Sequence, residues 1–116
     1  MILAAVDDLM FVSRISTAAQ QVGAEIVFVR SPEETLTQAR MLNPRLIILD
    51  LNSRRLDPLR TIVALKAEAG LASTHTLGFV SHVQGDLIEA AREAGIDEVL
   101  ARSAFTARLG EILLQG

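Results

Sequence analysis

Three aspartates stand directly behind two of the apolar segments of this sequence. Asp7 and Asp8 follow the run Met1–Val6, and Asp50 follows the run Leu46–Leu49. Carboxylates that lie close together repel one another and raise each other's pKa unless a cation lies among them. Hard oxygen ligands of this kind suit Mg²⁺. The pattern therefore favours an acidic pocket that holds a cation, provided that the fold brings the two segments together.

A purely structural role also accounts for part of this pattern. Asp7 and Asp8 precede a helical pattern, and acidic residues commonly cap the first turn of a helix. Capping does not explain Asp50, which ends an otherwise apolar segment. The three residues together indicate a functional pocket, while helix capping by the first pair stays open.

The elements that position these residues can be read from the hydrophobic pattern. Short apolar runs alternate with amphipathic stretches, which predicts a βα repeat with a parallel sheet. Strands are expected at Met1–Val6, Glu25–Val29, Arg45–Leu51, Thr74–Val80 and Glu98–Ala101. Helices are expected at Leu9–Val22, at Pro58–Ala69 with Leu59, Ile62 and Val63 inward, and at Val83–Ala94. Another helix is expected to run to Leu42 from a capping box formed by Ser31, Pro32 and Glu34. The last helix is expected to follow a cap at Ser103, with Phe105, Leu109, Ile112 and Leu113 inward.

This alternation predicts one α/β domain over residues 1–116, a flavodoxin-like (βα)5 sandwich of three layers. Right-handed crossovers place helices on both faces of the sheet, and the common strand order at this size is 2-1-3-4-5. Ligands of such sheets bind at the carboxyl ends of the strands, where the order reverses. Here that point lies between the first and third strands, so Asp7, Asp8 and Asp50 are expected to converge there.

The composition narrows the function. The chain has 116 residues, no cysteine and a net charge of -3 without a basic block, which disfavours cysteine chemistry and direct binding of nucleic acid. The longest apolar runs are too short to cross a membrane, and the start lacks the basic region of a signal peptide. We therefore expect a cytoplasmic protein without a membrane partner.

Three of these segments also resemble known motifs. The run Val6-Asp7-Asp8, the segment Leu46–Asp50 and the run Phe79-Val80-Ser81 have the order and spacing of the motifs of response-regulator receiver domains. The resemblance covers the whole chain, and the segment Leu100–Phe105 matches the end of the fifth strand and its turn.

The resemblance implies a signalling module of a two-component phosphorelay and not a metabolic enzyme. It implies that Asp50 accepts a phosphoryl group, and that Asp7, Asp8, Asp50 and the backbone carbonyl of Asn52 hold a weakly bound Mg²⁺. Ser81 would hydrogen-bond the phosphoryl group. The phosphodonor would be a histidine kinase, a phosphotransfer protein or a small acyl phosphate.

The resemblance also implies an output surface, made of the fourth helix, the fifth strand and the last helix. This surface would bind a downstream protein or a second copy of the chain in a weak, two-fold dimer. Its charged residues, available for reciprocal pairs, are Glu89, Arg92, Glu93, Asp97, Arg108 and Glu111.

The sequence departs from the receiver pattern at three positions around the fifth strand. Arg102 stands where the family has a lysine, Ser103 where it has a proline, and Val99 where it has an aromatic switch residue. Arg102 keeps the positive charge but carries a larger, planar group. It can assist catalysis or form a structural ion pair with Asp8 or Asp50.

Four functional interpretations follow. The chain is a receiver that is phosphorylated at Asp50, or a pseudo-receiver that binds partners without phosphorylation. A flavin- or nucleotide-binding domain would need a phosphate loop after the first strand, where this chain has Asp7 and Asp8. A haloacid-dehalogenase-type hydrolase would need an Asp-x-Asp motif after the first strand and a longer chain.

Overall fold

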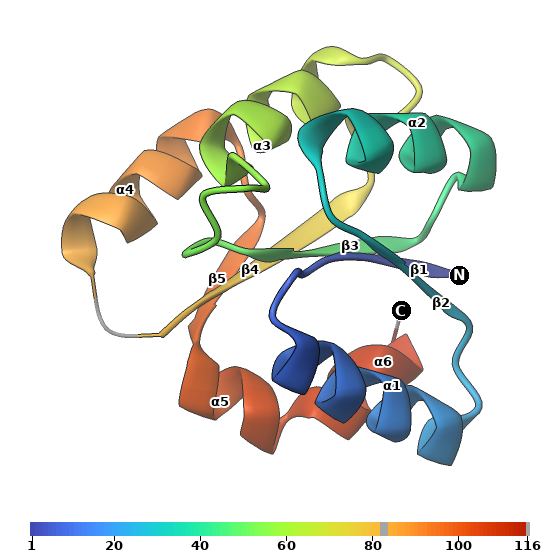
Figure 1. Ribbon diagram of the computed structural model, residues 1–116. Coiled ribbons are helices and arrows are strands. Elements are labelled where there is room, and N and C mark those ends of the chain that lie inside the picture. The colour runs from blue at the N-terminus through green and yellow to red at the C-terminus, as the bar shows by residue number, and fades with distance from the viewer. Residues whose placement is uncertain (82–83, 116) are drawn as a thin grey trace.

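The apolar runs form the five strands of one parallel sheet in the computed structural model, which describes residues 1–81 and 84–115 (Figure 1). The strands are β1 (Ile2–Ala5), β2 (Ile26–Val29), β3 (Leu46–Asp50), β4 (His75–Val80) and β5 (Glu98–Ala101). Their order is β2-β1-β3-β4-β5, and every pairing is parallel. The predicted flavodoxin-like order is confirmed.

Helices cover both faces of this sheet and complete the predicted three layers (Figure 1). They are α1 (Leu9–Val22), α2 (Pro32–Leu42), α3 (Pro58–Ala67), α4 (Gly85–Ala94), α5 (Arg102–Ala107) and α6 (Leu109–Gln115). The predicted start of the fourth helix at Val83 lies outside the described residues. None of the helices that the structure describes is both long and apolar enough to cross a membrane.

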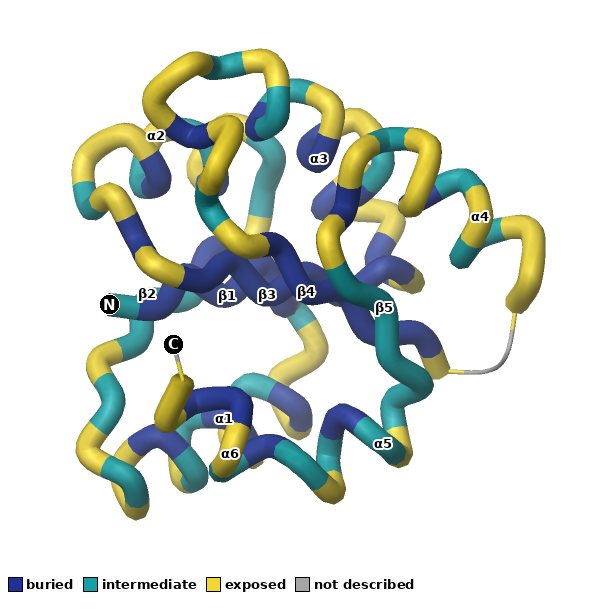
Figure 2. Tube along the Cα trace, turned by 180° about the vertical axis from the view of Figure 1, so that it is seen from behind, coloured by how far each residue is buried: buried dark blue, intermediate teal, exposed yellow. Residues whose placement is uncertain are grey.

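Two hydrophobic clusters, one on each face, hold the layers together. Ile48 and Phe79 belong to the cluster that packs against α1, α5 and α6, whereas Ile47 and Val80 belong to the cluster beneath α2, α3 and α4. This alternation follows from the two-residue period of a strand. The central strands are therefore buried between the helices, while β5 at the edge is only half-buried (Figure 2).

The predicted capping box of α2 is present in part. Ser31 Oγ accepts a hydrogen bond from the Glu34 N–H, which satisfies a backbone donor that the first turn of a helix leaves free. The reciprocal bond is shifted by one residue, because Glu34 Oε1 accepts it from the Arg30 N–H and not from that of the N-cap Ser31.

The last helix differs from the prediction. A kink at Arg108 (φ -102°, ψ 10°) divides it into α5 and α6. Gly110, two residues further on, weakens the helix locally, yet the Ile112 N–H still bonds the Arg108 carbonyl, and the predicted apolar face stays buried. The predicted cap at Ser103 is wrong, because the N-cap of α5 is Ala101, two residues earlier, and Ser103 lies within the helix.

The predicted inward position of Val63 is also wrong. Its side chain on α3 is exposed, whereas Ile62 and Leu65 carry the buried face of that helix. Consecutive residues of a helix are about 100° apart around its axis, so Val63 lies beside the face that Ile62 and Leu65 bury.

Two side chains pack closely against β4, and one of them belongs to Leu51, the residue that follows Asp50. A Cβ atom at Gly78 would lie 2.8 Å from Leu51 and 2.7 Å from Ile96. Only glycine therefore lets these two side chains pack directly on the strand. Leu51 is thereby seated in the core, which anchors the residue that follows Asp50.

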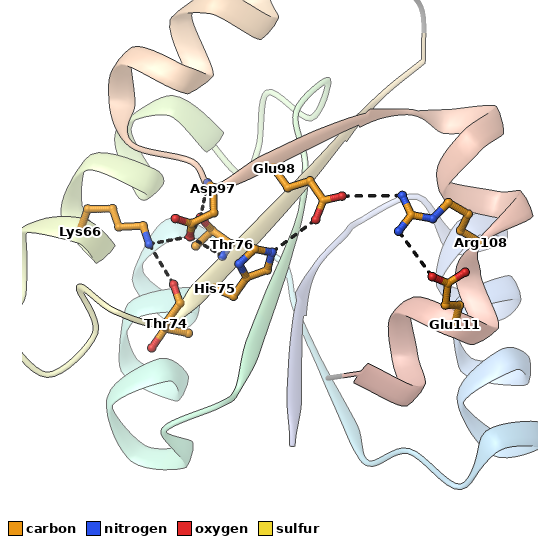
Figure 3. A network of polar contacts seen from close by, with 8 residues as sticks. All are labelled: Lys66, Thr74, His75, Thr76, Asp97, Glu98, Arg108 and Glu111. Atoms are coloured by element: carbon orange, nitrogen blue, oxygen red, sulfur yellow. Dashed lines mark hydrogen bonds and ion pairs between the residues drawn. The ribbon is translucent and has the colours of Figure 1, made fainter.

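A polar network ties α3 to β4 and β5 on the edge of the sheet where the strands begin (Figure 3). Asp97 Oδ2 accepts hydrogen bonds from Lys66 Nζ at 2.8 Å, from the Thr76 N–H at 2.8 Å and from the Thr76 hydroxyl at 2.9 Å. Burial raises the pKa of Asp97, but the bonds from Lys66 and Thr76 outweigh it and hold the pKa below its ordinary value.

We expect Asp97→Asn to lower the free energy of unfolding at neutral pH by about 1–2 kcal/mol. Hydrogen bonds to a charged group contribute about 1.5–3 kcal/mol, and the side chain is 38% exposed, so that solvent screening reduces the effect. Since the folded-state pKa is lowered, this stability is present above the ordinary aspartate pKa of about 3.9 and is lost as the pH falls through the folded value.

Urea unfolding of parent and variant, from neutral to acidic pH, measures this difference. Glu93→Gln, at an exposed position of α4, is the matched control and should leave stability unchanged. Equal stability of Asp97→Asn and the parent at every pH would contradict the role assigned to the network.

Candidate functional site

The fold brings the acidic residues of the two segments to one edge of the sheet. Strands β1 and β3 are neighbours, and Ala5 pairs with Leu49. Asp50, the last residue of β3, and Asp7, which follows β1, therefore lie at the carboxyl ends of adjacent strands, where the order of the sheet reverses. This is the position at which folds of this type bind their ligands.

Asp50 is the buried member of the group, with a side chain that is only 6% exposed. Its Oδ1 accepts a hydrogen bond of 3.0 Å from the Asn52 N–H, which fixes the carboxylate. Burial raises the pKa of Asp50, the bond from Asn52 and the charge of Arg102 oppose the rise, and the charges of Asp7 and Asp8 add to it. The result is a carboxylate with a raised pKa and a second oxygen, Oδ2, that faces the pocket.

Asp8 serves the helix and the pocket at once. Its Oδ1 accepts hydrogen bonds from the N–H groups of Met10 and Phe11 and so caps α1. Its Oδ2 lies 3.6 Å from Nη2 of Arg102. The capping role that the sequence left open is therefore present, together with a role in the pocket.

Arg102, the first residue of α5, carries the positive charge of the site. Its Nη2 lies 4.0 Å from Asp50 Oδ2 as well as 3.6 Å from Asp8 Oδ2, so one nitrogen serves two carboxylates. The structural ion pairs considered for Arg102 are thus present with both partners. These distances exceed the usual length of a charge-assisted hydrogen bond, which makes the contacts electrostatic.

The guanidinium of Arg102 lies on a stack of three aromatic rings. The rings of Phe11, Phe79 and Phe105 are stacked, with centroids 4.8 Å apart for Phe11 and Phe79 and 4.6 Å apart for Phe79 and Phe105. The guanidinium carbon of Arg102 lies 4.4 Å from the centroid of Phe11, within the range of a cation–π interaction. The sequence does not predict this contact, because helical periodicity does not show what lies against a ring.

Asn52 joins two loops of the site through its side chain, a role that the sequence did not indicate. Its Oδ1 accepts a hydrogen bond of 2.7 Å from the Ser81 N–H, and its Nδ2 donates one of 2.8 Å to Gln84. The loop after β3 is thereby tied to the loop after β4. Ser81 is exposed beside the pocket, and its backbone is held in place by this bond.

The donors of the site suit a hard cation, but Arg102 lies between them. Within residues 1–81 and 84–115, no three histidine, cysteine or acidic side chains lie close enough together to hold a metal ion. One oxygen of Asp8 and one of Asp50 are bound to backbone N–H groups, and the other oxygen of each faces Arg102. The carboxylates are thus arranged around a guanidinium.

A second charged group, at the opposite edge of the sheet, has its charges paired within the molecule (Figure 3). Glu98 lies 3.4 Å from Nε2 of His75 and 3.7 Å from Arg108, which lies 3.7 Å from Glu111. A cavity of about 210 Å³ adjoins the group. Since each of these side chains contacts another of the group, this edge carries no indication of a ligand.

Comparison with known proteins identifies the fold. No family model and no curated protein sequence matches the chain. Solved structures of response regulators match it over nearly its full length. The phosphorylated cyanobacterial phytochrome response regulator RcpA is 23% identical, with a TM-score of 0.81 over 98% of this chain and 88% of that chain.

Two further structures agree. The chemotaxis response regulator CheY4 of Vibrio cholerae is 18% identical, with a TM-score of 0.85 over 98% of this chain and 95% of that one. The Mn²⁺-bound form of the response regulator Rcp1 is 17% identical, with a TM-score of 0.78 over 98% and 88%. The chain has the receiver-domain fold. Likeness at this level of identity establishes a shared fold, whereas function depends on the residues of the site.

We expect Asn52→Ala to release the loop after β4 without unfolding the receiver fold. The Ser81 N–H loses its acceptor, so its hydrogen exchange should accelerate about fivefold, the equivalent of about 1 kcal/mol for one hydrogen bond. Amide exchange followed by NMR measures this change. The control Gln84→Ala leaves the acceptor of Ser81 in place and should have little effect; equal acceleration in both variants would contradict the assignment.

Proposed function

We propose that this chain is the receiver module of a two-component-type phosphorelay and accepts a phosphoryl group on Asp50. The observation that carries the proposal is the free Oδ2 of a buried carboxylate at the ligand-binding edge of a receiver fold, facing the positive charge of Arg102. A signalling module of this kind transfers a phosphoryl group to itself and turns over no metabolite.

In the proposed reaction, Asp50 Oδ2 attacks the phosphorus of a phosphohistidine or of a small acyl phosphate. The new bond joins Oδ2 to phosphorus, and the bond from phosphorus to the donor's nitrogen or oxygen breaks, so that the donor leaves with its electron pair. The Asn52 N–H holds Oδ1 and thereby directs Oδ2 into the pocket. Positive charge from Arg102 favours the ionised, nucleophilic form of Asp50 and the incoming phosphoryl oxygens.

The roles proposed for the metal ligands and for Ser81 rest on the sequence prediction. Asp7, Asp8, Asp50 and the carbonyl of Asn52 would hold Mg²⁺, which supplies positive charge to the phosphoryl oxygens when it is bound. Ser81 would donate its hydroxyl to the phosphoryl group; its exposure at the mouth of the pocket and the bond that holds its backbone support this role. The donor would be a histidine kinase or a phosphotransfer protein in the cytoplasm.

A specific observation favours a second candidate, a pseudo-receiver that binds partners without phosphorylation. Arg102 contacts Asp8 and Asp50 together, so the chain itself supplies one positive charge to the acidic pocket. In such a protein the acidic residues would stabilise the fold, and partner binding would follow from the surface alone.

We expect incubation with acetyl phosphate and Mg²⁺ to raise the intact mass of the parent by one phosphoryl group. Asp50→Asn should show no increase, because the nucleophilic oxygen is lost. Asp57→Asn is the matched control: Asp57 is exposed in the same loop, and its positive φ of 40° is tolerated by asparagine. An unchanged parent mass would favour the pseudo-receiver.

The output surface proposed from the sequence keeps fewer free charges than expected. Asp97 is bound to Lys66 and Thr76, and Arg108 pairs with Glu98 and Glu111. The exposed charges of α4 are Asp86, Glu89, Arg92 and Glu93, of which the last three belong to the predicted surface. We propose α4 as the centre of the surface that binds a downstream partner or a second copy.

A dimer through α4 should be weak and sensitive to salt, because exposed ion pairs contribute only about 0.2–1 kcal/mol each. Sedimentation at low and high salt tests this expectation. Arg92→Glu should abolish the association, whereas Arg55→Glu, the same charge change on the exposed loop before α3, should not. A tight dimer that ignores salt and Arg92→Glu would exclude this surface.

A further inference from the structure

The two free carboxylate oxygens of the pocket face the same guanidinium nitrogen. Oδ2 of Asp8 lies 3.6 Å and Oδ2 of Asp50 lies 4.0 Å from Nη2 of Arg102. These are oxygens that a divalent cation would need, and a cation that bound both would stand next to a positive charge. Like charges at such a distance repel, although solvent reaches Asp8 and Arg102 and weakens the repulsion. A divalent cation and this position of Arg102 therefore compete for the same two oxygens.

Contacts with aromatic rings stabilise the position of the Arg102 side chain, whereas a buried nitrogen without a hydrogen bond disfavours it. Phe11 and Phe79 lie under its guanidinium carbon at 4.4 Å and 5.6 Å from the ring centroids. Its Nε is buried and has no hydrogen-bond partner among the described residues. An unsatisfied buried donor regains its hydrogen bonds when it reaches water. The side chain is 33% exposed, so a path to solvent exists.

We propose that Arg102 is the resting cation of the pocket, and that a divalent cation binds only by displacing its guanidinium from Asp8 and Asp50. The chain thus carries its own competitor for the site. Apparent affinity for a divalent cation is reduced by the fraction of molecules in which Arg102 occupies the pocket. The proposal deepens the function proposed above, but it depends only on the charges of the pocket and not on phosphorylation.

Titration with Mg²⁺, followed by NMR shifts of the amides of Asp7, Asp8 and Asn52, tests the competition directly. Arg102→Gln removes the competing charge and should bind Mg²⁺ at least tenfold more tightly than the parent. Arg102→Lys keeps a charge but loses the planar group that lies on Phe11, and its affinity should fall between the two.

Two controls isolate the cause. Arg108→Gln makes the same change of net charge at the opposite edge of the sheet, where Arg108 pairs with Glu98, and should bind like the parent. In the parent itself, saturating Mg²⁺ should shift the Nε–H resonance of Arg102 as the side chain leaves its buried position. That signal tests the proposal without any variant, should Arg102→Gln fail to fold.

The proposal is overturned if Arg102→Gln binds Mg²⁺ no better than the parent, if Arg108→Gln gains as much, or if the Nε–H resonance of Arg102 does not move at saturation. Phosphorylation is scored separately by mass. Tighter binding in Arg102→Gln together with an unmodified Asp50 in the parent would remove the proposed phosphoryl transfer and leave the competition standing.

Discussion

Negative charge gathered at a partly buried edge of a sheet has to be balanced, and the rest of the site follows from how this chain balances it. The parallel order brings Asp7, Asp8 and Asp50 to one edge of the sheet, where Asp50 is buried and Asp8 is partly exposed. The counter-charge comes from Arg102, because α5 begins directly at the end of β5. The aromatic stack beneath the guanidinium then becomes a part of the site as much as of the core.

Much of this arrangement could be predicted because it depends on periodicity. The two-residue alternation of the strands and the apolar face of the helices determine which residues are buried, and the βα repeat leaves few possible strand orders. The carboxylates then fall at the carboxyl edge without any knowledge of side-chain contacts. The same reasoning gave the ion pairs of Arg102 with Asp8 or Asp50 as one of two roles, since the fifth strand ends at the same edge of the sheet.

The features that could not be predicted depend on where side chains point and how loops approach each other, which the hydrophobic periodicity does not show. Nothing in the sequence distinguishes Ser103 as a cap from Ser103 as a helical residue: the predicted end of β5 at Ala101 is correct, but α5 begins directly after it. The contact of Phe11 with Arg102 joins residues that are far apart in the chain, and the bridge from Asn52 to Ser81 depends on how two loops approach each other.

Asp8 uses both of its carboxylate oxygens, and this restricts which amino acids can replace it. One oxygen holds the first turn of α1, and the other faces Arg102. An alanine there would weaken the helix and the pocket together, so that one effect could not be told from the other. Asparagine keeps an oxygen for the cap and removes the charge. A substitution at position 8 can therefore separate the architecture of the helix from the chemistry of the pocket.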